Sequence, residues 1–239
     1  MTLDNMATFI CNKVGRPDAA SVSSCKGFLG RRYELIWDSQ LWKDSLTTVS
    51  VPVAAGVQDI SLGVAIDRVV AVRWDTIGLA PVQHEAVYYI DPTLFDKSGT
   101  PAAYVIMPAS PSGGSVIRLV QKPSKDAVLT VLGKRKVSIL TQSGEIVQRT
   151  LTQTSDSPYI RGIDHGLLSF AEGDMLTRER QYGKAQLIYG EASSTLRIAY
   201  NLEMGQQASE VQVSPSHGGE WSRDDWELGT SLQKSDIGL

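Results

Sequence analysis

A stripe of apolar residues near the C-terminal end of the chain restricts the fold more than any other feature. Its members recur at steps of three and four residues: Leu168, Ala171 and Met175, then Tyr182, Ala185, Tyr189, Ala192, Leu196 and Ala199. This spacing places them on one side of an α-helix. The sequence therefore predicts one long amphipathic helix over residues 164–206.

The stripe alternates small and large side chains, which suits close packing against another helix. It serves either as core packing or as a contact between subunits. The residues that would make either contact are Tyr182, Ala185, Tyr189, Ala192 and Leu196. Gly183 and Gly190 lie one heptad apart in the same helix and cost about 1 kcal/mol each relative to Ala. They either admit another helix closely or mark a kink.

The beginning of the chain also has helical spacing. One face of a first helix carries Leu3, Met6, Ile10 and Val14. The segment 15–17, Gly-Arg-Pro, ends it, and Asp18 can cap a second helix because its carboxylate accepts unpaired backbone N–H groups. We expect the second helix to end near Leu46.

The apolar period changes to two in the middle of the chain, which indicates β-strands. Proline and glycine separate short strands, as is typical of an antiparallel sheet or sandwich. The predicted strands are residues 48–53, 57–62, 66–74, 102–107, 115–121, 127–132 and 137–141. A short helix is predicted over residues 84–96.

Residues 141–162 are polar and rich in Thr, Ser and Gln. Ser143 and Gly144 are suited to the tip of a hairpin or to an exposed loop. The segment is therefore either a mobile surface loop or a docking hairpin.

Helical periodicity stops at Gln207, and the remaining residues contain six acidic and two basic side chains. Glycine and proline oppose a compact core in this segment, yet it contains two tryptophans, which a disordered spacer does not need. We expect an extended arm over residues 207–239 whose docking residues are Trp221, Arg223, Asp224, Asp225 and Trp226.

The fold class predicted from these patterns is α+β. Residues 1–47 and 163–206 form a helical bundle, residues 48–162 form an inserted antiparallel β-rich module, and residues 207–239 form the arm.

No catalytic or metal-binding motif stands out. His84 and His165 are expected at helix starts, His217 lies in a Gly/Ser segment, and there is no HxH or HExxH spacing. Cys11 and Cys25 fall in predicted helices and are interpreted as core residues of a reduced protein, with a disulfide between them as the alternative. We expect no catalytic residue, no metal site and no cofactor.

The formal net charge of −3 argues against a free-standing DNA-binding protein. The basic run Lys134, Arg135 and Lys136 either touches phosphates or forms a solvated hairpin end. The chain lacks the basic and apolar regions of a signal peptide and any stretch apolar enough to span a membrane, so we expect it to be made and kept in a cytoplasm.

Several stretches, in this order, resemble the head-to-tail adaptor (head-completion) proteins of tailed bacteriophages. They are NKVGRPDAASV, YELIWDSQLWKD, LFDKSGTPAAYVI, IRLVQKPSKDAVLTVLGKRK and GIDHGLLSFAEGDMLTRERQYGKAQLIYGEA. The resemblance covers about residues 5–206 and includes a Gly-x-Pro-x-x-Tyr turn from Gly99 to Tyr104. The polar segment 141–162 and the Trp-bearing tail depart from it.

The resemblance implies a structural virion protein of the neck and not an enzyme. Such adaptors form a homo-oligomeric ring, commonly a dodecamer, that binds the portal protein, meets the tail or the next neck protein and continues the DNA channel with only passive contact to DNA. Their terminal helices form a bundle around a β-rich insertion. The alternatives are a tail-terminator or other neck protein, and, in a different class, a soluble enzyme or ligand-binding protein.

Overall fold

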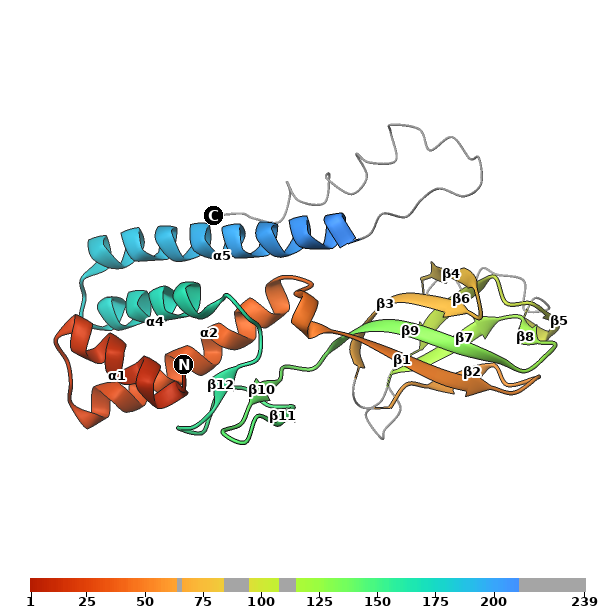
Figure 1. The fold of residues 1–239 in the computed structure, drawn as a ribbon, viewed down its shortest axis with the longest axis horizontal. Helices are drawn as coiled ribbons and strands as arrows, with labels where there is room; N and C mark the ends of the chain where they lie inside the picture. The colour runs from red at the N-terminus through yellow and green to blue at the C-terminus, as the bar shows by residue number, and fades with distance from the viewer. Residues whose placement is uncertain (64–65, 84–94, 108–114, 211–239) are drawn as a thin grey trace, which may run out of the picture. The chain divides into compact units, whose positions relative to one another are not determined.

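The computed structural model describes residues 1–63, 66–83, 95–107 and 115–210, with side chains up to Glu203. These residues form four α-helices and a large, mainly antiparallel sheet, which confirms the α+β class (Figure 1). The short helix predicted over residues 84–96 lies almost entirely outside the described residues.

The first helix, α1, spans Leu3–Val14 and ends where the sequence predicts. Gly15 has φ = +78°, a left-handed conformation that residues with a Cβ rarely adopt, and its N–H donates to the Asn12 carbonyl at 3.2 Å. Helix α2 spans Ala19–Ser39, and Asp18 caps it by accepting the Ser21 N–H at 2.9 Å. Both local signals therefore act as predicted.

Helix α2 ends at Ser39, so the predicted end near Leu46 is wrong. Its last carbonyls bond to side chains in place of a further helical turn: the Trp42 indole donates to Ile36 O at 2.8 Å, and the Lys134 ammonium donates to Trp37 O and to Gln40 O. A short 3₁₀ helix, η1 (Lys43–Ser45), then leads into the first strand.

Seven strands form one sheet in the order β1-β9-β3-β4-β6-β7-β2, with β4 and β6 parallel and the other neighbours antiparallel. Their bounds are β1 Leu46–Val53, β2 Asp59–Ser61, β3 Ile66–Trp74, β4 Ile77–Val82, β6 Ala103–Met107, β7 Val116–Val120 and β9 Ala127–Arg135. Strand β4, which contains Gly78 and Pro81, was not predicted.

The two edge strands of this sheet are consecutive in the chain. Because only residues 54–58 join β1 to β2, the sheet must curl until its edges lie close together (Figure 1). Its interior is a separate core whose largest buried side chains include Trp74, Ile117, Leu119 and Leu129.

Residues 139–158 form a three-stranded sheet of β10 (Ile139–Leu140), β11 (Ile146–Val147) and β12 (Ser157–Pro158). A turn at residues 141–144 joins β10 to β11, and Gly144 has φ = +81°. The fully buried Asp156 carboxylate accepts Arg149 Nη2 at 2.6 Å and the Thr152 and Gln153 N–H groups. Two very short strands, β5 (Ser98–Gly99) and β8 (Lys122–Pro123), pair in parallel.

The predicted single helix over residues 164–206 is two helices, α4 (Asp164–Arg178) and α5 (Tyr182–Glu210). Arg180 has φ = +61° at the junction, and the Arg180 and Gln181 N–H groups bond back to Thr177 O and Leu176 O. These bonds end α4 and reverse the chain direction, so the apolar stripe is divided between two helices.

Helices α1, α2 and α4 share one core with residues of the 139–160 segment. Its side chains include Leu3, Ile10, Leu29, Trp37, Leu151, Ile160, Leu167 and Met175. The Tyr33 hydroxyl joins these parts because it donates to Ser138 O and accepts the Tyr159 N–H at 3.0 Å. The 141–162 segment is therefore packed against the helices along part of its length.

Candidate functional site

The predicted packing residues lie on α5, and four of the five face α4. Ala185 and Ala192 are buried, with 2% and 0% exposure, and Tyr189 and Leu196 are partly buried. Tyr182 is 63% exposed at the start of α5 and does not join them. Within one chain, the stripe therefore serves core packing from Ala185 onward.

Two glycines of α4 receive the large side chains of this stripe. A Cβ at Gly166 would stand 2.6 Å from Leu196 Cδ2, and a Cβ at Gly173 would overlap the ring of Tyr189. Gly166 and Gly173 are one heptad apart on α4, and Tyr189 and Leu196 are one heptad apart on α5. Because the first glycine meets the second of these side chains and the second glycine meets the first, α4 and α5 are antiparallel. Neither glycine was predicted from sequence as a packing residue, although their heptad spacing was a usable signal.

A charged cluster connects three helices at the same place. The Arg32 guanidinium on α2 makes two bonds to the Asp174 carboxylate on α4, at 2.8 Å and 2.6 Å. Its Cζ also lies 5.1 Å from the Phe170 ring centroid and 5.3 Å from that of Tyr189, whose hydroxyl donates to Asp174 Oδ1 at 2.7 Å.

Every member of this cluster has a partner within the chain. Hydrogen bonding to Asp174 raises the pKa of Arg32, and burial raises the pKa of the Tyr189 hydroxyl. The cluster therefore fixes α2, α4 and α5 together, and it leaves no reactive group poised for chemistry.

Lys134, the first residue of the basic run, is not part of a solvated hairpin end. That side chain is 3% exposed and binds the last carbonyls of α2, and burial lowers its pKa. The Arg135 guanidinium lies 6.0 Å from the ring centroid of Tyr159, whereas Lys136 is exposed. Lys134 thus has a structural role and is not presented to phosphates.

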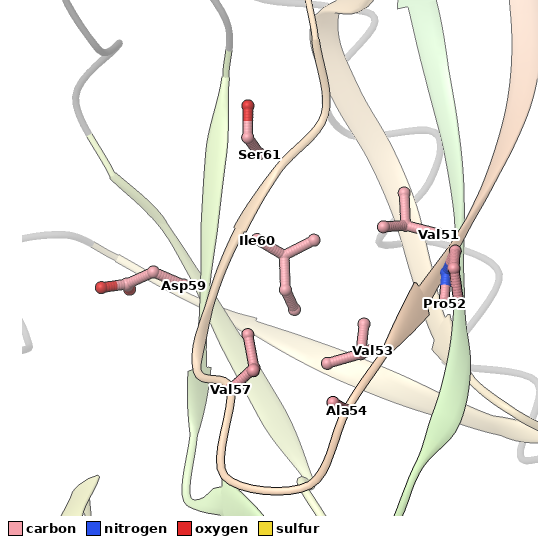
Figure 2. A pocket seen from close by; sticks show the side chains of 8 residues that line it. All are labelled: Val51, Pro52, Val53, Ala54, Val57, Asp59, Ile60 and Ser61. Atoms are coloured by element: carbon pink, nitrogen blue, oxygen red, sulfur yellow. The ribbon is translucent and has the colours of Figure 1, made fainter.

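A shallow pocket of about 320 Å³ lies where the two edges of the curled sheet approach each other (Figure 2). Its lining residues are Val51, Pro52, Val53, Ala54, Val57, Asp59, Ile60 and Ser61. The Asp59 side chain points away from the apolar ones and bonds to Arg118 at 2.6 Å and 2.7 Å, which lowers the pKa of Asp59. The pocket therefore offers apolar contact without a convergent set of polar groups.

In the part of the chain that the structure describes, no group of three His, Cys, Asp or Glu side chains could hold a metal ion. His165 lies exposed at the start of α4, as predicted, whereas His84 and His217 lie outside the described residues. Cys11 and Cys25 are fully buried and contact each other. Both are free thiols in the structure, as in the interpretation as core residues, and they form no disulfide with each other.

The predicted docking residues of the arm, Trp221, Arg223, Asp224, Asp225 and Trp226, lie outside the described residues. Across residues 1–63, 66–83, 95–107 and 115–210, no helix is long and apolar enough to cross a bilayer. Neither a known family model nor a curated protein sequence matches the chain.

Proposed function

We propose that this chain is a structural protein of a tailed bacteriophage, a head-to-tail adaptor that forms a ring below the portal. The ring, in this proposal, continues the DNA channel and docks the tail or the next neck protein. The chain acts through its surfaces and not as an enzyme.

One observation carries the proposal. Helices from the two ends of the described chain share a core, in which Leu3 and Cys25 pack with Leu167 and Met175. The seven-stranded sheet between them in sequence encloses a core of its own. This arrangement supports the bundle with an inserted β-rich module that the resemblance to phage adaptors implies.

Side-chain hydrogen bonds join the helical core to the sheet that encloses the second core. The Trp37 indole of α2 donates to Arg135 O of β9 at 3.1 Å, and Lys134 of the same strand binds the end of α2. In this proposal, these bonds hold the β-rich module to the helical bundle.

The predicted arm of residues 207–239, whose first four residues the structure places in α5, is assigned to portal attachment in this proposal. Trp221 and Trp226 have the side chain most enriched at interface hot spots, where truncation costs about 2 kcal/mol or more. Asp224 and Asp225 would guide docking to basic groups, and Arg223 to an acidic one.

The test is assembly on purified portal rings, followed by negative-stain microscopy and co-sedimentation. The full chain should add a ring of density to the portal, and a chain truncated after Gln206 should stay folded by circular dichroism and fail to add it. If the truncated chain docks with unchanged affinity, the arm is not the attachment device. If the full chain never binds portal, the adaptor proposal itself fails.

A DNA channel must let the duplex slide, and phosphate affinity rises with each cation presented. The net charge of −3 and the burial of Lys134 both favour weak contact. The proposal therefore expects negligible duplex DNA binding at physiological salt in a gel-shift assay, and tight binding there would contradict it.

A further inference from the structure

The face of α5 that points away from α4 carries exposed apolar side chains. Leu187 is 77% exposed, Ile198 58% and Leu202 64%. Gly183 and Gly190 lie on the same face, and among the described residues nothing approaches within 4 Å of where their Cβ atoms would stand. Packing against the described residues therefore requires neither glycine.

These residues form a second seam on α5. Gly183, Leu187, Gly190, Ser194 and Ile198 follow one another at steps of four, three, four and four, which keeps them on one helix face. Ser194 is exposed, while Ala192, two residues earlier and almost opposite on the helix, is buried against α4. The seam therefore faces outward.

The inner side of α5 shows how this chain joins two helices. There, heptad-spaced glycines of α4 receive the heptad-spaced side chains of Tyr189 and Leu196. The outer seam also carries heptad-spaced glycines, Gly183 and Gly190, but its large side chains, Leu187 and Ile198, lie on the same helix as the glycines. A surface that carries both halves of a contact is complementary to itself.

In a two-fold symmetric pair of such helices, only the antiparallel direction places the large residues against the small ones. In a parallel pair, Gly183 would face Gly183 and Leu187 would face Leu187. In an antiparallel pair with its two-fold axis beside Glu191, Ile198 of one copy lies against Gly183 of the other, and Leu187 lies against Ser194.

We propose that the outer face of α5 binds the same face of a second copy of this chain, with the two helices antiparallel. The contact covers Leu187 and Ile198 and fills the space beside Gly183. A two-fold contact cannot close a head-to-tail ring, so it is separate from the proposed ring. It does not rest on the proposed function.

The first test is the mass of the protein in solution, measured by size-exclusion chromatography with light scattering across a dilution series. The full-length chain should be a dimer, and Leu187→Glu should raise its Kd by more than about tenfold. Ile106→Glu is the matched control, since Ile106 is also exposed (42%) but lies on β6. A chain that stays monomeric, or a Leu187→Glu variant that dimerises normally, overturns the proposal.

The second test determines the relative direction of the two α5 helices by disulfide cross-linking of single exposed cysteines. Glu191→Cys lies beside the axis and should cross-link, whereas two copies of Asn201→Cys would stand about 30 Å apart at 1.5 Å per residue and should not. Cross-linking of both variants would mean parallel helices, and cross-linking of neither would mean another interface. Either result overturns the antiparallel contact, while docking to portal is measured separately.

Discussion

The ring of Tyr189 on α5 occupies the space that a β-carbon would need at Gly173 on α4. The close approach explains why a helix-destabilising residue stands in the buried middle of α4, and why Tyr189 can reach both Thr177 and Asp174 with its hydroxyl. The stability of the helical core should therefore depend on glycine at this position.

Gly173→Ala should lower the free energy of unfolding by up to about 2 kcal/mol. Overpacking a core costs about 1–3 kcal/mol, and the better helix propensity of Ala returns about 1 kcal/mol of it. Gly27→Ala on α2 is the control, because nothing lies within 4 Å of a Cβ there, and it should stabilise the protein slightly. Urea unfolding measures the unfolding free energy of both variants. An equal increase in both would show that the ring of Tyr189 moves aside without an energetic cost.

Ala192→Glu should destabilise the protein by about 3 kcal/mol or more. Ala192 is fully buried against α4, so the new carboxylate would be desolvated without a partner. Leu187→Glu changes the exposed side of the same helix and should alter the unfolding free energy of the monomer by less than about 0.5 kcal/mol. Unchanged stability and assembly in Ala192→Glu would mean that the stripe does not pack as the structure has it.

Sequence patterns predicted the elements whose causes are local. Gly15 and Asp18 each act through backbone groups a few residues away, and the strand predicted over residues 66–74 has the bounds of β3. The apolar stripe likewise identified Ala185 and Ala192 as packing residues. These features need no information about distant parts of the chain.

The features that were predicted wrongly, or not predicted, depend on contacts between residues far apart in sequence. The chain reverses at residues 179–181, Glu-Arg-Gln, without glycine or proline, and the heptad stripe continues across the reversal, so periodicity could not reveal it. Lys134 belongs to a charged run that resembles a solvated turn, and only the fold brings the end of α2 to it. The glycine pair of α4 was visible, but its partners on α5 were not.

Asp18→Asn should remove one contribution to the loss of folding stability at low pH. The bonds that the Asp18 carboxylate accepts from Ser21 lower its pKa from 3.8, so the charged form stabilises the folded state. This contribution is complete above the usual pKa and is lost as the pH falls through the lower, folded-state pKa. The stability difference between wild type and Asp18→Asn should therefore be constant near neutral pH and shrink below about pH 4. A difference that grows in acid would contradict the assignment.

Cys11 and Cys25 should be unreactive in the folded protein. Both thiols are fully buried, and burial raises the pKa of each, so the thiolate that attacks disulfide reagents is scarce and shielded. Titration with an aromatic disulfide reagent at neutral pH should detect no thiol under native conditions and both thiols after unfolding in guanidinium. The Lys136→Cys variant is the control, because Lys136 is exposed and a thiol there should react at once in the folded, freshly reduced protein. Fast reaction of a native thiol would mean that α1 and α2 separate readily, and the packing of these helices would then be much weaker than their shared core implies.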